Sequence, residues 1–178
     1  MRKLVSIVIL VLIICFMPNN SLVRSEPLSD ETPGKHEVPD SPAIIAFAVR
    51  SFSLYSSFLN DYVQKEDQMV PVHGSTRSKA QAYLNRGFTP EMTEAIIDEC
   101  TQWDDSLGAL TIVPCDGIPV LTGEDADKIQ LYKETNKIIL VRKYNNCYAE
   151  GDNYVFLVTM TPDGDAWKIS ELSFDAAE

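Results

Sequence analysis

The last part of the chain carries three short runs of alternating residues, and these constrain the fold more than any other stretch. Ile138–Tyr144 and Tyr154–Thr161 are rich in β-branched and aromatic side chains, which suit a pleated, half-buried surface. The turn signal Pro162–Asp165 separates the second run from a third, in which Trp167 and Ile169 share one face. We therefore expect a C-terminal antiparallel meander.

The middle run predicts a central strand. Phe156 and Val158 fall on one face and Val155 and Leu157 on the other, so both faces are largely apolar and we expect cover on both sides. In the third run, Leu172 and Phe174 are out of step with the earlier residues, which indicates a β-bulge near Ser170.

The N-terminus has the pattern of an export signal. Arg2-Lys3 precedes the apolar run Leu4–Met17, and Val23 and Ser25 are small residues suited to a cleavage site. The run is short for a membrane span. We expect residues 1–25 to be a signal peptide, cleaved near Ser25, and the protein to be exported to the periplasm or beyond the cell. An uncleaved N-terminal membrane anchor is the alternative.

The charge of the chain excludes some partners. The 178 residues have a formal net charge of −11, and removal of residues 1–25 leaves 12 basic against 26 acidic side chains, a net charge of −14. Phosphate backbones and anionic membranes attract the opposite charge. We therefore expect no nucleic-acid partner, and contact with a membrane only through the leader during export.

The exported part divides into a flexible polar linker over residues 26–42, with Pro27, Pro33 and Pro39 in its first fifteen residues, and a single domain over residues 43–178. Ser41-Pro42 is a helix start with Ser41 as the cap. An apolar stripe then follows at steps of three and four, which predicts a long amphipathic helix: Ile44, Ala48, Phe52, Tyr55, Leu59 and Tyr62.

Two shorter helices and two irregular segments are expected next. Lys79–Arg86 and the segment from Thr89-Pro90 are helical, the latter with an inner stripe of Met92, Ile96, Cys100 and Trp103. Gln64–Ser78 is polar and is interpreted as a loop. Residues 104–136 have no sustained period, although Leu110–Val113 and Ile118–Leu121 are candidates for brief strands.

Helices followed by an antiparallel meander predict an α+β domain. Three segments resemble a known family: Phe47–Phe52, Tyr83–Met92 and Trp167–Ile169. Over about residues 43–174 the chain is similar to the nuclear-transport-factor-2-like superfamily, and within it to the exported bacterial domain-of-unknown-function family 3828. The resemblance implies N-terminal helices packed on a curved antiparallel sheet in a cone-like arrangement. It carries over no catalytic residue.

The expected function is non-catalytic binding of a small ligand or a protein between the first helix and the sheet. The residues that we expect in this pocket are Phe52, Tyr55, Asp116, Tyr154 and Trp167. One alternative is a cone-fold enzyme of the isomerase or hydratase type, with a buried carboxylate such as Asp116 whose pKa is raised by burial. Another is an acidic inhibitor or immunity-type protein. The ligand, the partner and the oligomeric state stay open.

No motif for a cofactor or metal is present. The sequence has no glycine-rich phosphate loop, no GxSxG and no HExxH, so we expect no cofactor and no catalytic metal. The acidic stretches Gly123–Asp127 and Asp163–Asp165 lack the ligand spacing of a calcium loop and are interpreted as solvated turns.

Three cysteines remain after the leader: Cys100, Cys115 and Cys147. An exported protein meets oxidising conditions, so a disulfide is expected. We favour Cys100–Cys115, because its closure needs only a local chain reversal, and it stabilises by ~3 kcal/mol in the chain-entropy model. Cys115–Cys147 is the close alternative.

Export is directly testable. N-terminal sequencing of the protein recovered from the expressing cell is expected to begin near Glu26, because signal peptidase cleaves after the small residue Ser25. A membrane-embedded product that begins at Met1 would show the anchor instead.

Overall fold

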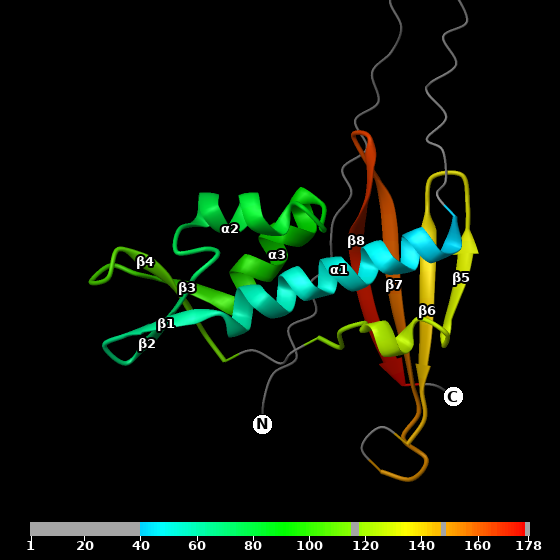
Figure 1. Cartoon of the computed structure of the whole chain (residues 1–178). Coiled ribbons are helices and arrows are strands. Elements are labelled where there is room, and N and C mark those ends of the chain that lie inside the picture. Colours follow the sequence, from blue (N-terminus) through cyan, green and yellow to red (C-terminus); the bar gives the residue numbers. More distant parts are fainter. Residues whose placement is uncertain (1–39, 115–117, 147–148, 177–178) are drawn as a thin grey trace, which may run out of the picture. The chain divides into compact units, whose positions relative to one another are not determined.

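A four-stranded antiparallel sheet forms the C-terminal half of the fold. The structure is a computed structural model that describes residues 40–114, 118–146 and 149–176. The strands follow in sheet order β5-β6-β7-β8, with the bounds Ile129–Lys133, Ile138–Tyr144, Tyr154–Asp163 and Ala166–Ala176. The meander of β6, β7 and β8 is confirmed, and β5 extends it by one short edge strand that the sequence did not reveal (Figure 1).

Strand β7 lies inside the sheet, as predicted, and one of its faces is buried in the core. Phe156, Val158 and Met160 are no more than 1% exposed. The pairing with β8 shifts between Thr159 and Met160, so that Ser170 has no partner in the register, which confirms the predicted bulge.

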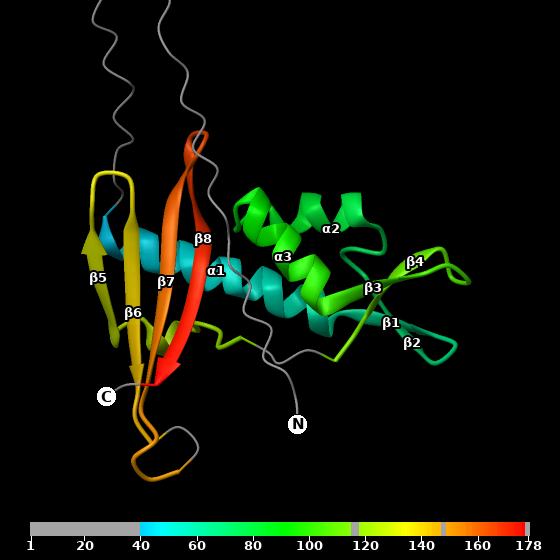
Figure 2. The ribbon, with the colours of Figure 1, turned by 180° about the vertical axis from the view of Figure 1, so that it is seen from behind.

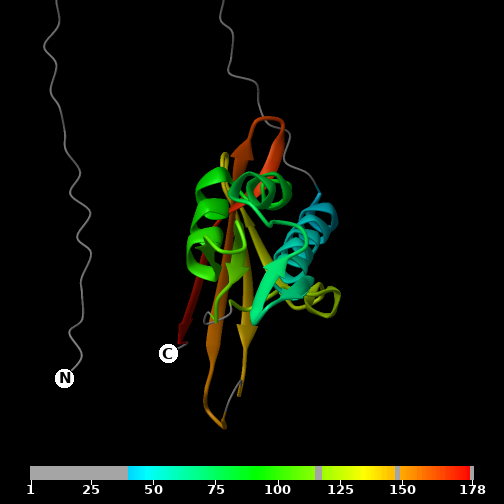
Figure 3. The same ribbon diagram turned by 90° about the vertical axis from the view of Figure 1, so that its left-hand side faces the viewer.

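Helix α1 (Ser41–Asn60) runs across the strands of the sheet (Figure 1). Seen at 90°, the sheet stands nearly edge-on and α1 (cyan) lies on one side of it (Figure 3). The opposite face carries the half-buried Val155 and Leu157, and no described helix lies over it (Figure 2). The predicted cover on both faces is therefore wrong for the part of the chain that the structure describes.

The start and the end of α1 differ from the prediction by a few residues. Asp40, and not Ser41, is the cap: its Oδ1 accepts a hydrogen bond from Ala43 N at 3.0 Å. The buried stripe is Ile44, Ala48, Ser51, Phe52, Tyr55 and Phe58. Tyr62 does not continue it, because the helix ends at Asn60 and Tyr62 begins a strand in which it is 45% exposed.

Helices α2 (Arg77–Leu84) and α3 (Pro90–Cys100) lie close to the predicted positions. Thr89 caps α3, since its Oγ1 accepts a hydrogen bond from Met92 N at 3.4 Å. Trp103 is not on the inner stripe of α3, because the helix ends at Cys100 and Trp103 is 53% exposed in the next strand.

Two short hairpins lie at the far end of α1 from the meander. The first pairs β1 (Tyr62–Lys65) with β2 (Gln68–Pro71), where the sequence predicted a loop, and the second pairs β3 (Thr101–Asp104) with β4 (Ala109–Ile112). Strand β4 confirms one predicted brief strand, but Ile118–Leu121 is not a strand. Figure 1 shows the hairpins side by side, and Leu110 N donates to Ser75 O at 2.9 Å.

The link between α2 and α3 joins the helices to the sheet. Gly87 O accepts from Ile169 N at 3.0 Å, and Thr89 N donates to Ile169 O at 2.9 Å, so Phe88 and Ile169 form a parallel bridge. A Cβ at position 87 would lie 2.6 Å from Ser51 Oγ, closer than real Cβ contacts come, so glycine lets this link lie directly on α1. The described domain is thus α+β, as predicted, with its helices packed on one antiparallel sheet.

The two tryptophans of the chain offer a matched test of the core. Trp167 is 8% exposed and belongs to the buried cluster, whereas Trp103 is exposed. Trp167→Ala is expected to lower the free energy of unfolding by about 3–5 kcal/mol, as truncation of a buried tryptophan does. Trp103→Ala is expected to stay within about 0.5 kcal/mol of the parent, as surface changes do.

Urea denaturation followed by circular dichroism measures both variants. A loss below about 1 kcal/mol for Trp167→Ala, in the range of surface substitutions, would contradict its place in the core.

Candidate functional site

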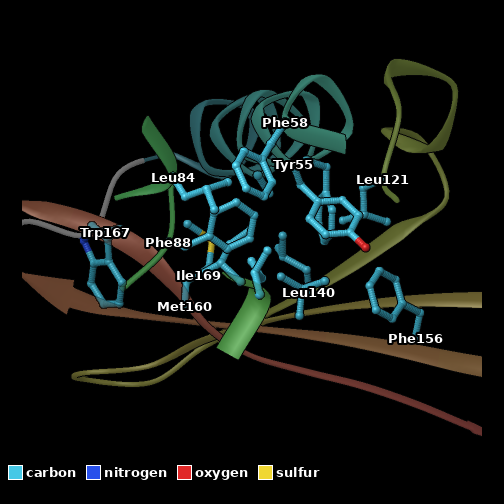
Figure 4. Packing of buried hydrophobic residues seen from close by; sticks show 14 of the residues in the cluster. Tyr55, Phe58, Leu84, Phe88, Leu121, Leu140, Phe156, Met160, Trp167 and Ile169 are labelled. Carbon is cyan, nitrogen blue, oxygen red and sulfur yellow. The ribbon is translucent and has the colours of Figure 1, made fainter. Parts of the chain in front are cut away.

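Three of the predicted pocket residues lie in the hydrophobic core. Phe52, Tyr55 and Trp167 all belong to the buried cluster between α1 and the sheet (Figure 4). The Phe52 ring packs edge-on against Phe88, with ring centroids 6.4 Å apart. It also packs against Phe156, with ring centroids 5.8 Å apart. The Phe52 side chain is therefore committed to core packing.

Tyr55 borders a small cavity. It shares this cavity of about 30 Å³ with residues of α3 and with Ile118, which is room for about one water molecule. Tyr154 lies farther along the sheet and stacks on Phe174, with ring centroids 4.8 Å apart. Asp116 lies outside the described residues.

A larger depression lies between α1 and the segment that contains Gly123 and Ala126. We call it the α1 groove; its volume is about 530 Å³, within the range of small-molecule sites. Its lining is apolar apart from Ser41 and one guanidinium, and contains no carboxylate: Ser41, Pro42, Ile45, Ala46, Val49, Arg50, Gly123 and Ala126. These helical residues recur at steps of three and four, so they form a second stripe beside the core stripe.

The second wall of the groove is the short helix η1 (Gly123–Asp125), and a buried ion pair holds it in place. Asp125 is 8% exposed, and its Oδ1 accepts a hydrogen bond from Arg142 Nε of strand β6 at 2.9 Å. Its Oδ2 accepts from both Thr122 N and Thr122 Oγ1 at 3.0 Å. The expectation of a solvated turn at Gly123–Asp127 is therefore wrong for Asp125.

The ionisation of Asp125 follows from these contacts. Burial raises the pKa of its carboxyl, but the hydrogen bonds from Thr122 and the Arg142 guanidinium outweigh burial, and the pKa lies below its usual value. A lowered folded pKa means that the pair stabilises the fold at neutral pH and loses its contribution as the pH falls through that pKa. The groove wall is thus fixed under neutral conditions.

A second depression adjoins the first along α1. This arginine hollow has a volume of about 290 Å³ and is lined by Phe47, Arg50, Ser51, Ser53, Leu54 and Arg86. Arg50 lines both depressions. Arg86 comes from the link between α2 and α3, and the close approach of Gly87 to Ser51 brings it to the helix. Each guanidinium lies over a ring three residues earlier in the chain, Arg50 5.9 Å from the Phe47 centroid and Arg86 5.4 Å from the Tyr83 centroid.

Other kinds of site find little support. Among residues 40–114, 118–146 and 149–176, no three histidine, cysteine or acidic side chains are grouped to hold a metal ion. By length and composition α1 passes a test for membrane spans, with a mean hydropathy of 1.3, but the core helix of a domain passes the same test. The buried stripe of α1 fits the second description.

Comparison of the chain with protein-family models, with curated proteins and with solved structures gave no match in any of the three.

Sequence reasoning missed the α1 groove because it assigned the apolar residues of α1 to one buried face. Ile45, Ala46 and Val49 lie outside the core stripe of steps three and four that begins at Ile44. Apolar residues beyond the width of one buried stripe were the available signal. The η1 wall carried no such signal, since the Asp125–Arg142 pair joins residues 17 apart.

The predicted disulfide is not tested by the structure, because Cys115 and Cys147 lie outside the described residues. Cys100 is 3% exposed at the end of α3, and the β3–β4 hairpin returns the chain to it, with Val113 N donating to Cys100 O at 3.0 Å. The pairing of Cys100 with Cys115 therefore stays a prediction.

Non-reducing peptide mapping of the purified protein is expected to recover Cys100 joined to Cys115, because the oxidising compartment predicted for this chain retains disulfides. A stoichiometric peptide pair that contains Cys147 would contradict this pairing. Three free thiols would contradict oxidation altogether.

Proposed function

We propose that this protein is an exported, non-catalytic binding domain that holds an apolar small molecule in the α1 groove. The observation that carries the proposal is the lining of the groove, which is apolar and lacks any carboxylate. Small-molecule sites are concave and mostly apolar, with a few polar groups that fix orientation. The groove has this composition, with Arg50 as the charged group at one end.

A relationship to the nuclear-transport-factor-2-like superfamily is part of the proposal. The three segments of the resemblance meet in the fold: Ser51 of the first lies against Gly87 of the second, which pairs with Ile169 of the third. This mutual packing gives a physical reason for their occurrence together. The ligand site proposed here lies between α1 and η1, at the edge of the core, where Ile45 and Val49 pack against the buried cluster.

Catalysis by a buried carboxylate is less well supported than binding. General acid–base catalysis works best when the pKa of the catalytic group lies near the operating pH. Asp125 is the buried carboxylate of the described residues, and its pKa is lowered by Thr122 and Arg142. It therefore stays ionised and engaged at neutral pH, as a structural group does.

A second candidate function is protein binding through the two hairpins. They expose large apolar side chains, Tyr62, Val63 and Trp103, and Val72 follows β2. Acidic residues lie at both turns, Glu66-Asp67 and Asp104-Asp105. Exposed aromatic residues are typical anchors of protein interfaces, and the acidic rim would suit a basic partner. This surface matches the inhibitor or immunity-type alternative.

One pair of variants tests the groove. Ala46 lines it and is exposed, so Ala46→Asp adds a carboxylate to the apolar lining without disturbing the core. Ala43 is also exposed on α1 but does not line the groove, so Ala43→Asp is the matched control. The neutral fluorophore N-phenyl-1-naphthylamine is expected to bind the parent and the control saturably, and Ala46→Asp at least about tenfold more weakly.

Fluorescence titration of the exported protein measures the three affinities. Equal affinity in both variants would place the probe elsewhere. No saturable binding to the parent would reject the groove as a site and leave the hairpin surface as the better candidate.

A further inference from the structure

The arginines of the domain fall into two groups. Arg77 forms ion pairs with Glu94 and Asp98, and Arg142 forms one with Asp125. Arg50 and Arg86 are the other two arginines of the described residues, and no ion pair with a described carboxylate involves either. Both of these line the arginine hollow. In a chain of net charge −11, two such guanidiniums in one depression are a local reversal of sign.

The arginine hollow is positively charged, and its other polar groups have hydrogen-bond partners within α1. Its two serines are engaged within α1, since Ser51 Oγ donates to Phe47 O and Ser53 Oγ donates to Val49 O, each at 3.0 Å. The guanidiniums therefore provide the hydrogen-bond donors of the hollow. A guanidinium presents a planar fork of N–H groups that binds a carboxylate bidentately.

The two depressions are neighbours on α1 and share Arg50. Pro42, Ala46 and Arg50 follow at steps of four, and Leu54 continues the same row, so the apolar groove leads into the arginine hollow at the position of Arg50. A molecule with an apolar chain and a charged end matches this order of surfaces.

We propose that the natural ligand is a single-chain amphiphile with a carboxylate head, of the fatty-acid class. The chain lies along Pro42, Ile45 and Val49, and the head lies between Arg50 and Arg86. This inference depends on the proposed function, because it names the ligand class of the same groove.

Matched ligands and variants test the head group. Dodecanoate and dodecanol share one chain and differ in charge, and both are titrated below their aggregation limits into the exported protein by isothermal calorimetry. Dodecanoate is expected to bind at least about tenfold more tightly than dodecanol, and the preference to fall as salt rises. Arg50→Gln with Arg86→Gln is expected to reduce the preference to near one, because neither guanidinium then remains to bind the carboxylate.

The control is Arg77→Gln, because Arg77 is exposed, ion-paired and outside both depressions. It is expected to keep the full preference. Equal binding of dodecanoate and dodecanol to the parent would overturn the carboxylate head and leave the apolar groove intact. Tighter binding of dodecyl phosphate than of dodecanoate would overturn the choice of carboxylate, and no saturable binding of any of these ligands would reject the groove itself.

Discussion

The close contact between Gly87 and Ser51 is the constraint on which the arrangement of the domain depends. At this point Gly87, in the link between α2 and α3, lies on the buried face of α1. The backbone of the same link is hydrogen-bonded to Ile169 of β8. Helix, link and sheet are thereby fixed at one place, with Phe88 fully buried beside it. A larger residue at position 87 would separate α1 from the link and open the core around Phe52 and Phe88.

The position of one wall of the arginine hollow follows from this contact. Arg86 precedes Gly87 directly, so the distance between Arg86 and α1 is set by how closely the link approaches Ser51. The η1 wall of the neighbouring α1 groove is set independently, by the ion pair of Asp125 and Arg142. The Gly87 contact and this ion pair thus position one wall of each depression, as preorganised binding requires.

The elements that were predicted correctly are those marked by a pattern of neighbouring residues. The alternation in Tyr154–Thr161 and the Thr89-Pro90 cap were enough for β7 and the start of α3. The two-stranded hairpin from Tyr62 to Pro71 was missed, because all four residues of β1 are exposed and its second half, Gln64 and Lys65, is polar. The roles of Asp125 and Arg86 depend on residues far away in the sequence, so no local pattern identifies them. The groove was missed for a different reason, since one helix carries two apolar stripes.

Those two stripes have a consequence for the proposed export of the chain. A translocating polypeptide is unfolded, and α1 then presents a second segment, after the leader, whose length and hydropathy suit a bilayer. Lipid and the growing sheet compete for the same side chains, Phe52 and Phe58 among them. When α1 docks promptly on the meander, its apolar side chains are no longer available to lipid. The emergence of the C-terminal strands therefore affects whether the translocating chain is released from the membrane.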